Sequence, residues 1–313
     1  MGLSAFICVY LRIHLLEGSE AMNLVVQGNE VETQDLKELH RLARGAAIER
    51  ISDEAFRITK ADPAAKREVA AHCAKARLDW GFVEEGRTLA GFGLIAMDMD
   101  STLISIECID EIADFAGRKP EVAAVTAAAM RGEIDWPESL RRRVRALAGL
   151  DEGTLERVYA ERLRFNKGAE ELLAAARRNN VRTLLVSGGF TYFTDRVREK
   201  LGFDFAYSNS LVVEHGKLAG SVTGDLVDAQ GKAAHVARLK KELGIARERV
   251  MAIGDGANDL PMMAEAGTSV AYHAKPVVRE KADYALDYAG LDAVLNLFPD
   301  SSGLSASRSG SGK

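Results

Sequence analysis

The stretch Gly93-Leu-Ile-Ala-Met-Asp-Met-Asp-Ser-Thr102 joins an apolar run to a closely spaced pair of carboxylates. The run over 93–97 has the length of a buried strand. Asp98 and Asp100 can face the same volume at the end of that strand, and two like charges so close are unfavourable unless a cation or a shared proton offsets them. The pair therefore indicates a metal site, an acid/base role or both, although an ordinary polar turn after a strand would have the same pattern.

Further apolar runs of strand length follow along the chain and alternate with segments of helical periodicity. The runs cover 181–186, 249–253 and 268–272, and the helical segments cover 169–179, 193–201, 231–243 and 260–266. Strands that alternate with helices predict an α/β fold with a doubly wound parallel sheet. Sheets of this kind place their ligand sites at the carboxyl ends of the strands, so the residues after each run are the candidates for function.

Small and acidic residues follow the second and third runs. Ser187-Gly188-Gly189 combines a hydroxyl with unhindered backbone N–H groups, which favours an anion site, although Gly-Gly is also common in plain turns. The segment 254–259, Gly-Asp-Gly-Ala-Asn-Asp, offers the oxygen ligands that a hard cation such as magnesium prefers. A helix N-cap would account for Asp259 but not for Asp255. Lys232 opens the helix before the third run, at the end where a cation is disfavoured unless it has a partner.

Together these residues resemble the four motifs of the haloacid-dehalogenase superfamily, so the sheet is expected to be Rossmannoid and similar to that of the superfamily. Within the superfamily, the sequence most resembles the phosphoserine phosphatase family, because Glu107 within 107–113 and Arg143 within 139–144 also match the motifs of that family. The resemblance extends from about residue 93 to about residue 297.

The resemblance implies a magnesium-dependent phosphatase in which Asp98 is the nucleophile and forms an aspartyl-phosphate. Asp100 would protonate the leaving group and then deprotonate the attacking water. The Asp98 carboxylate, the Asp100 main-chain carbonyl and Asp255 would bind Mg²⁺.

The same resemblance implies the substrate contacts. Ser187, Gly188 and Lys232 would hold the phosphoryl oxygens, and Asn258 would contact the phosphate or the substrate. Asp259 and Thr102 would support the site.

A helical cap insert is expected over about 104–166. By resemblance Glu107 pairs with the ammonium of phosphoserine and Arg143 with its carboxylate, and the fork of a guanidinium suits a carboxylate. Arg141 and Arg142 lie beside Arg143, so a solvated basic face is the alternative. Trp136 could cover the closed site or could simply belong to the core.

Before the catalytic segment, residues 22–85 show the order βαββαβ, which predicts a ferredoxin-like, ACT-like α+β domain. Its role is open between amino-acid sensing and service as a lid or dimerisation module. The phosphatase domain is expected over 90–298. Residues 1–21 make a poor targeting signal and are expected to be an unstructured extension, and the Ser/Gly-rich residues 299–313 a disordered tail.

Composition limits the class of protein. The 41 Lys and Arg against 46 Asp and Glu give a net charge of −5 without a long basic stretch, which disfavours nucleic acid as a partner. No run approaches the roughly 20 apolar residues of a membrane span. The three cysteines are odd in number and form no C-x-x-C pair, so a disulfide framework is not expected. A reducing, cytoplasmic location is therefore expected. A homodimer is a candidate assembly. The open alternatives are a phosphatase for another small phosphate, such as phosphohomoserine or a sugar phosphate, and a non-enzymatic phospho-accepting receiver.

Overall fold

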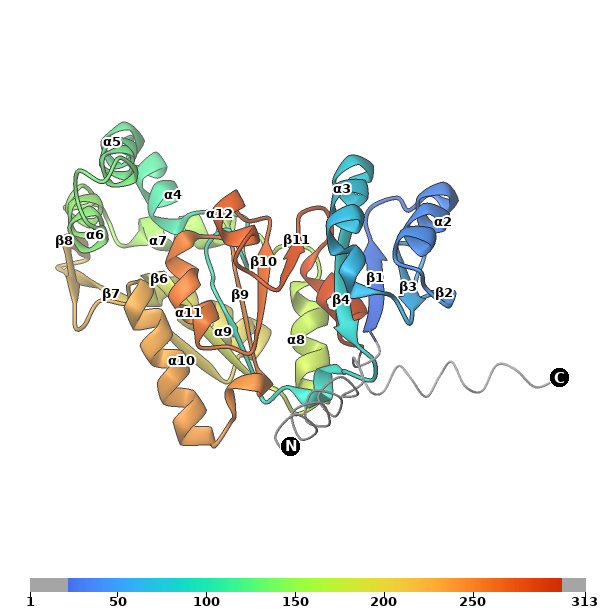
Figure 1. Cartoon of the computed structure of the whole chain (residues 1–313). Helices are drawn as coiled ribbons and strands as arrows, with labels where there is room; N and C mark the ends of the chain where they lie inside the picture. The colour runs from blue at the N-terminus through green and yellow to red at the C-terminus, as the bar shows by residue number, and fades with distance from the viewer. Residues whose placement is uncertain (1–21, 300–313) are drawn as a thin grey trace, which may run out of the picture. The chain divides into compact units, whose positions relative to one another are not determined.

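The computed structural model describes residues 22–299 (Figure 1). The chain divides into two compact units, with the boundary between Arg87 and Thr88. The extension expected over 1–21 and all but the first residue of the tail expected over 299–313 lie outside the described residues. The domain limits inferred from the sequence therefore stay predictions at both ends of the chain.

The first unit is a four-stranded antiparallel sheet with two helices packed together on one face. The strand order is β2-β3-β1-β4, which is the order of a ferredoxin-like sheet. Leu24 and Val26 of the central strand meet Leu39 and Val69 of the helices in its core. A relationship to ACT modules stays a prediction. The elements are β1 (Met22–Gln27), α2 (Thr33–Leu42), β2 (Ala47–Arg50), β3 (Ala55–Thr59), a 3-10 turn (Pro63–Ala65), α3 (Lys66–Ala76) and β4 (Asp79–Glu84).

The second unit contains a mostly parallel sheet with the strand order β11-β10-β9-β5-β6-β7-β8. Every neighbouring pair is parallel except the last, in which β8 returns antiparallel to β7. The predicted α/β fold with a doubly wound sheet is thus confirmed. The strands are β5 (Leu94–Met97), β6 (Arg182–Phe190), β7 (Phe205–Glu214), β8 (Lys217–Thr223), β9 (Val250–Gly254), β10 (Thr268–Tyr272) and β11 (Tyr284–Leu286).

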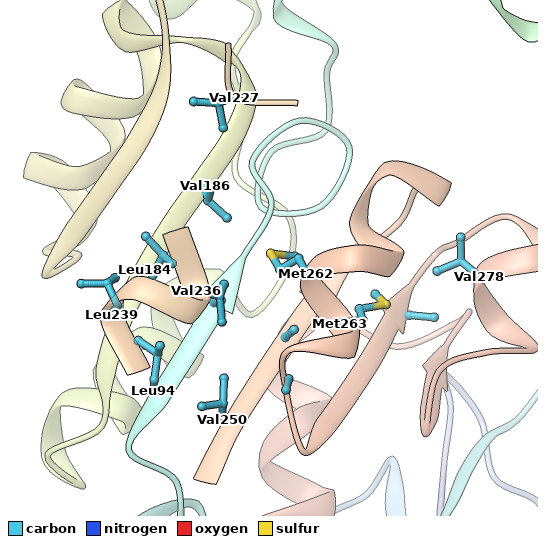
Figure 2. Packing of buried hydrophobic residues seen from close by; sticks show 14 of the residues in the cluster. Leu94, Leu184, Val186, Val227, Val236, Leu239, Val250, Met262, Met263 and Val278 are labelled. Atoms are coloured by element: carbon cyan, nitrogen blue, oxygen red, sulfur yellow. The ribbon is translucent and has the colours of Figure 1, made fainter. Parts of the chain in front are cut away.

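Apolar packing holds the helices against this sheet. Figure 2 shows Leu94, Leu184 and Val250 of three adjacent strands beside Val236 of α10 and Met262 of α11. The cluster is fully buried, so these helices fix the sheet from one face. The helices that flank the strands are α8 (Ala169–Arg178), α9 (Thr191–Leu201), α10 (Ala229–Leu243), α11 (Leu260–Ala264), α12 (Pro276–Arg279) and α13 (Val294–Leu297), with 3-10 turns at Leu89–Gly91, Arg247–Arg249, Ala257–Asp259 and Leu291–Ala293.

The chain between β5 and β6 is helical, and its two connections run side by side. Ser105 N donates to the Arg164 carbonyl at 3.0 Å, and Asn166 N donates to the Leu103 carbonyl at 2.9 Å. The helices between these connections therefore leave the sheet and return to it at one place. These helices, which form the insert, are α4 (Cys108–Phe115), α5 (Lys119–Met130), α6 (Trp136–Arg145) and α7 (Gly153–Arg157), followed by a π-helical turn (Val158–Arg162).

Two features differ from the sequence-based expectation. Strand β6 does not end before Ser187 but continues to Phe190, with a shift in its register to β7 between Val186 and Phe190. The expectation that Ser187, Gly188 and Gly189 follow the end of the strand is therefore wrong, because the strand carries them through a bulge. The hairpin β7–β8 was also not predicted, because most of its residues are half-buried and form no continuous apolar run.

Candidate active site

An acidic group lies where β5 and β9 end. Asp98 follows β5, Asp255 follows β9, and Asp259 directly precedes α11. One carboxylate oxygen from each lies within 4.8 Å of the others. Since β5 and β9 are parallel neighbours, their carboxyl ends bring residues 157 positions apart in the sequence to one edge of the sheet.

Lys232 balances this group from α10. Its Nζ donates to Asp98 Oδ1 at 2.5 Å and to Asp259 Oδ1 at 2.7 Å, and only 1% of the residue is exposed. Burial lowers the pKa of Lys232, but the two carboxylates raise it by more, so the net direction is upward and the lysine is cationic. Burial and the Asp259 charge raise the pKa of Asp98 above its usual value.

Asp259 organises the loop after β9. Its Oδ2 accepts from Asp255 N at 3.1 Å and from Gly256 N at 3.0 Å, while its Oδ1 is held by Lys232. Gly254 is required here, because a Cβ on it would clash with the Asp259 carboxylate. Both oxygens of Asp259 are thus engaged in holding the loop.

The remaining carboxylate oxygens suit a cation. Asp98 uses Oδ1 for Lys232, and Asp255 uses Oδ1 to accept from Thr102 Oγ1 at 3.1 Å, which leaves Oδ2 of each. Burial, followed by the charge of Asp259, raises the pKa of Asp255. A group of oxygen donors whose ionisation is unfavourable without a counter-charge fits a hard divalent cation.

Asp100 lies beside this group and is held in place by two donors. Its Oδ1 accepts from Cys108 N at 2.8 Å and its Oδ2 accepts from Ser187 Oγ at 3.0 Å, while Gly189 N donates to Ser187 Oγ at 2.8 Å. A Cβ on Gly189 would lie 2.7 Å from Asp100 Oδ2, so a side chain there would displace the carboxylate. The bulge of β6 therefore brings the Ser187 hydroxyl, itself held by Gly189 N, against Asp100.

Glu107 and Arg143 come from the insert. Glu107 precedes α4, and its Oε1 accepts from Ser101 Oγ at 2.7 Å. Burial by surrounding protein and the charge of Asp100 raise the pKa of Glu107 to about 7. Arg143 lies on α6 with Nε buried and without a hydrogen-bond partner among the described residues, and burial lowers its pKa. A buried guanidinium N–H without an acceptor indicates a missing anionic partner.

A cavity of about 550 Å³ connects these groups. Its size suits a small metabolite. Thr102 and Asp259 lie behind its wall, where they hold Asp255 and Lys232. All the other predicted site residues line it: Asp98, Asp100, Glu107, Arg143, Ser187, Gly188, Lys232, Asp255 and Asn258.

The cavity also has lining residues that sequence reasoning missed. Asp110 lies one turn after Glu107 on α4, and Ser139 lies one turn before Arg143 on α6, so helical spacing from the predicted residues could have found both. Lys275 follows β10, and a search of every strand end would have included it. Trp136 lies against Gly188, since a Cβ added to Gly188 would be 3.0 Å from the Trp136 ring. The Trp136 ring also lines the cavity and so covers it on this side.

None of the helices within residues 22–299 has the length and apolar character that crossing a membrane requires.

Comparison with known proteins identifies the family. The model of the haloacid dehalogenase-like hydrolase family matches residues 95–264, and a domain family of unknown function matches residues 24–69. The phosphoserine phosphatase of Albidiferax ferrireducens is 54% identical over 215 residues, which are 67% of this chain and 91% of that protein. That of Haemophilus influenzae is 49% identical over 209 residues, covering 67% of this chain and 66% of that protein.

Solved structures agree with this assignment. The unliganded probable phosphoserine phosphatase of Vibrio cholerae superposes with a TM-score of 0.79 at 37% identity, covering 94% of this chain and 90% of that one. A substrate-bound phosphoserine phosphatase superposes with a TM-score of 0.62 at 38% identity, covering 66% and 98%. The chain therefore belongs to the haloacid dehalogenase-like hydrolase family.

Proposed function

We propose that this protein is a magnesium-dependent phosphomonoesterase that hydrolyses O-phospho-L-serine to L-serine and phosphate, a reaction that yields serine for biosynthesis. One observation carries the proposal. A single cavity is lined by Asp98 and by Lys232, Glu107 and Arg143, whose charges are opposite to those of the phosphate, ammonium and carboxylate of phosphoserine in that order. The similarity to phosphoserine phosphatases supports it.

In the first step an Asp98 carboxylate oxygen attacks the phosphorus and the bond from phosphorus to the serine oxygen breaks. Asp100 gives its proton to that departing oxygen. In the second step Asp100 takes a proton from water, the water oxygen attacks the phosphorus of the aspartyl-phosphate, and the bond to Asp98 breaks. Two hydrogen bonds hold the Asp100 carboxyl group in the wall of the cavity, which supports its use in both steps.

Mg²⁺ would be held by Asp98, the Asp100 carbonyl and Asp255, and when bound it supplies positive charge to the phosphoryl oxygens. Lys232 provides a second positive charge from within the protein, and its two carboxylate partners fix its position. Ser187 and Gly188 would contact the phosphoryl oxygens from the bulge of β6, and Asn258 from the loop after β9.

The test is phosphate release from phosphoserine, phosphothreonine, phosphohomoserine and sugar phosphates, with Mg²⁺ or with a chelator. We expect phosphoserine to have the highest kcat/KM and the chelator to abolish turnover. Equal rates on sugar phosphates would favour the alternative of a phosphatase for another small metabolite. A stable phosphoprotein without turnover would favour the receiver alternative, which the presence of a second carboxylate, Asp100, in the cavity disfavours.

Arg143→Ala is expected to reduce kcat/KM for phosphoserine by about 100-fold, because a charge-assisted bond to the substrate carboxylate contributes roughly 3 kcal/mol. Hydrolysis of p-nitrophenyl phosphate, which lacks that carboxylate, should fall much less. Arg142 pairs with Glu138 at 2.7 Å on the exposed side of the same helix, so Arg142→Ala is the matched control. Equal losses on both substrates would contradict carboxylate recognition.

Mg²⁺ binding is expected to release protons and to tighten as pH rises from 5 to 8. The reason is that the metal-free protein holds the pKa values of Asp98 and Asp255 above their usual range, so the cation competes with protons for these carboxylates. Titration calorimetry in buffers of different ionisation enthalpy measures the proton count. A metal affinity independent of pH would contradict this account.

A cytoplasmic location and assembly as a homodimer remain predictions from the sequence. Fractionation of cells and light scattering of the purified protein test them.

A further inference from the structure

Ser101 has a backbone conformation that serine rarely adopts. Its φ is +59°, in the left-handed region that favours glycine, and it directly follows Asp100. Glycine would adopt this conformation without a steric penalty. A residue other than glycine is expected at such a position when its side chain makes a contact that glycine cannot make. The contacts of the Ser101 side chain therefore show whether it has a function.

The contacts of Ser101 close the loop between the two carboxylates Asp100 and Glu107. Ser101 N donates to the Ile106 carbonyl at 3.2 Å, and Ser101 Oγ donates to Glu107 Oε1 at 2.7 Å. Beside them, Cys108 N donates to Asp100 Oδ1 at 2.8 Å. The three bonds tie the start of α4 in the insert to the segment that carries the nucleophile.

Glu107 depends on this support. Its side chain is exposed to the cavity, and among the described residues a single hydrogen bond, from Ser101 Oγ, holds its carboxylate. A glutamate side chain with a free carboxylate samples several rotamers, and ordering it costs side-chain entropy when a ligand binds. The neighbouring Asp100 charge also disfavours the ionised form of Glu107, whereas the Ser101 hydroxyl favours it.

We propose that Ser101 is a positioning residue for substrate recognition, whose hydroxyl, presented by the left-handed backbone, holds the Glu107 carboxylate in the cavity to receive the substrate ammonium. The hydroxyl thereby links ammonium recognition in the insert to the loop that carries Asp98 and Asp100. This inference rests on the proposed function, because Glu107 needs an ammonium to bind.

The test compares phosphoserine with its analogue that lacks the amino group, 3-(phosphonooxy)propanoate. Ser101→Ala removes the hydroxyl and keeps a Cβ, and Ser101→Gly removes both the hydroxyl and the backbone penalty. We expect both variants to lower the preference for phosphoserine by about tenfold, mainly through KM, since the lost bond involves a charged acceptor. Ser101→Thr keeps the hydroxyl and should retain most of the preference.

Stability separates positioning from a merely structural role. Ser101→Gly should unfold at the same urea concentration as the wild type, or a higher one, and still lose the preference for phosphoserine. Ser101→Thr should be less stable than the wild type and keep that preference. The matched control is Ser105→Ala, because Ser105 is an exposed serine in the same connection. A preference that follows stability across the variants, or equal losses on both substrates, would overturn the role of Ser101. A wild-type protein without preference for phosphoserine would instead overturn the proposed function.

Discussion

Asp98→Asn is expected to reduce kcat by at least about 10³-fold, because an amide cannot form the aspartyl-phosphate and no neighbouring group can replace a covalent nucleophile. Asp98 is 4% exposed, and its N–H donates to the Ile253 carbonyl at 3.0 Å, so the backbone should place the amide where the carboxylate was. The measurement is phosphate release from phosphoserine with Mg²⁺ present, together with the unfolding temperature of the variant.

Trapping of the intermediate supplies an independent readout. Brief incubation with radiolabelled phosphoserine and acid quenching should label the wild type and not Asp98→Asn. A labelled variant, or a variant that keeps more than a tenth of the wild-type kcat, would contradict the assignment of Asp98. Asp114→Asn is the matched control, because Asp114 lies in α4 and pairs with Arg162 at 3.3 Å outside the cavity.

Lys232→Met is expected to abolish detectable turnover and to lower the free energy of unfolding of the metal-free protein by about 3–5 kcal/mol at pH 8. The substitution leaves the carboxylates of Asp98 and Asp259 buried without their shared cation. Turnover is lost because the phosphoryl oxygens lose a positive charge. Stability is lost because the folded state must bear two like charges.

The destabilisation should depend on pH in a defined direction. Without Lys232 the folded-state pKa of Asp98 lies still further above its value of about 3.9 in the unfolded chain. A raised carboxyl pKa gives stability that is present at low pH and lost as pH rises, so the variant should be closer to the wild type at pH 5 than at pH 8. Urea unfolding at both pH values, with a chelator, measures this.

Lys240→Met is the control for loss of a lysine ion pair on the same helix. Lys240 pairs with Glu265 at 2.6 Å at a partly exposed position, so loss of the pair should cost about 1 kcal/mol of stability with near-normal turnover.

Added Mg²⁺ should restore part of the stability of Lys232→Met, because the cation can neutralise the same carboxylates. Wild-type stability of Lys232→Met at pH 8 in chelator would contradict the balance of charges described above.

The elements that the sequence predicted well are those whose apolar pattern is local and strong. The central strands β5, β9 and β10 lie within one residue of the predicted limits, because each is an uninterrupted buried run. Strand β11, of three residues, and the hairpin β7–β8, of mixed burial, lack such a pattern and were not predicted. Residues at the ends of the predicted strands were correctly expected to meet, because parallel strands share a carboxyl edge.

The sequence alone thus determined the fold class, the family and nine of the residues that line the candidate site, but not Asp110, Ser139 or Lys275. Only the tertiary structure decided how they are paired: Lys232 between Asp98 and Asp259, Ser187 on Asp100, and the Arg143 Nε without a partner. The physical reason is that strand periodicity and motif spacing are properties of neighbouring residues. The charge and hydrogen-bond partners of a buried side chain depend instead on segments that the sheet order brings together, such as Asp98 and Asp259, which are 161 positions apart in the chain.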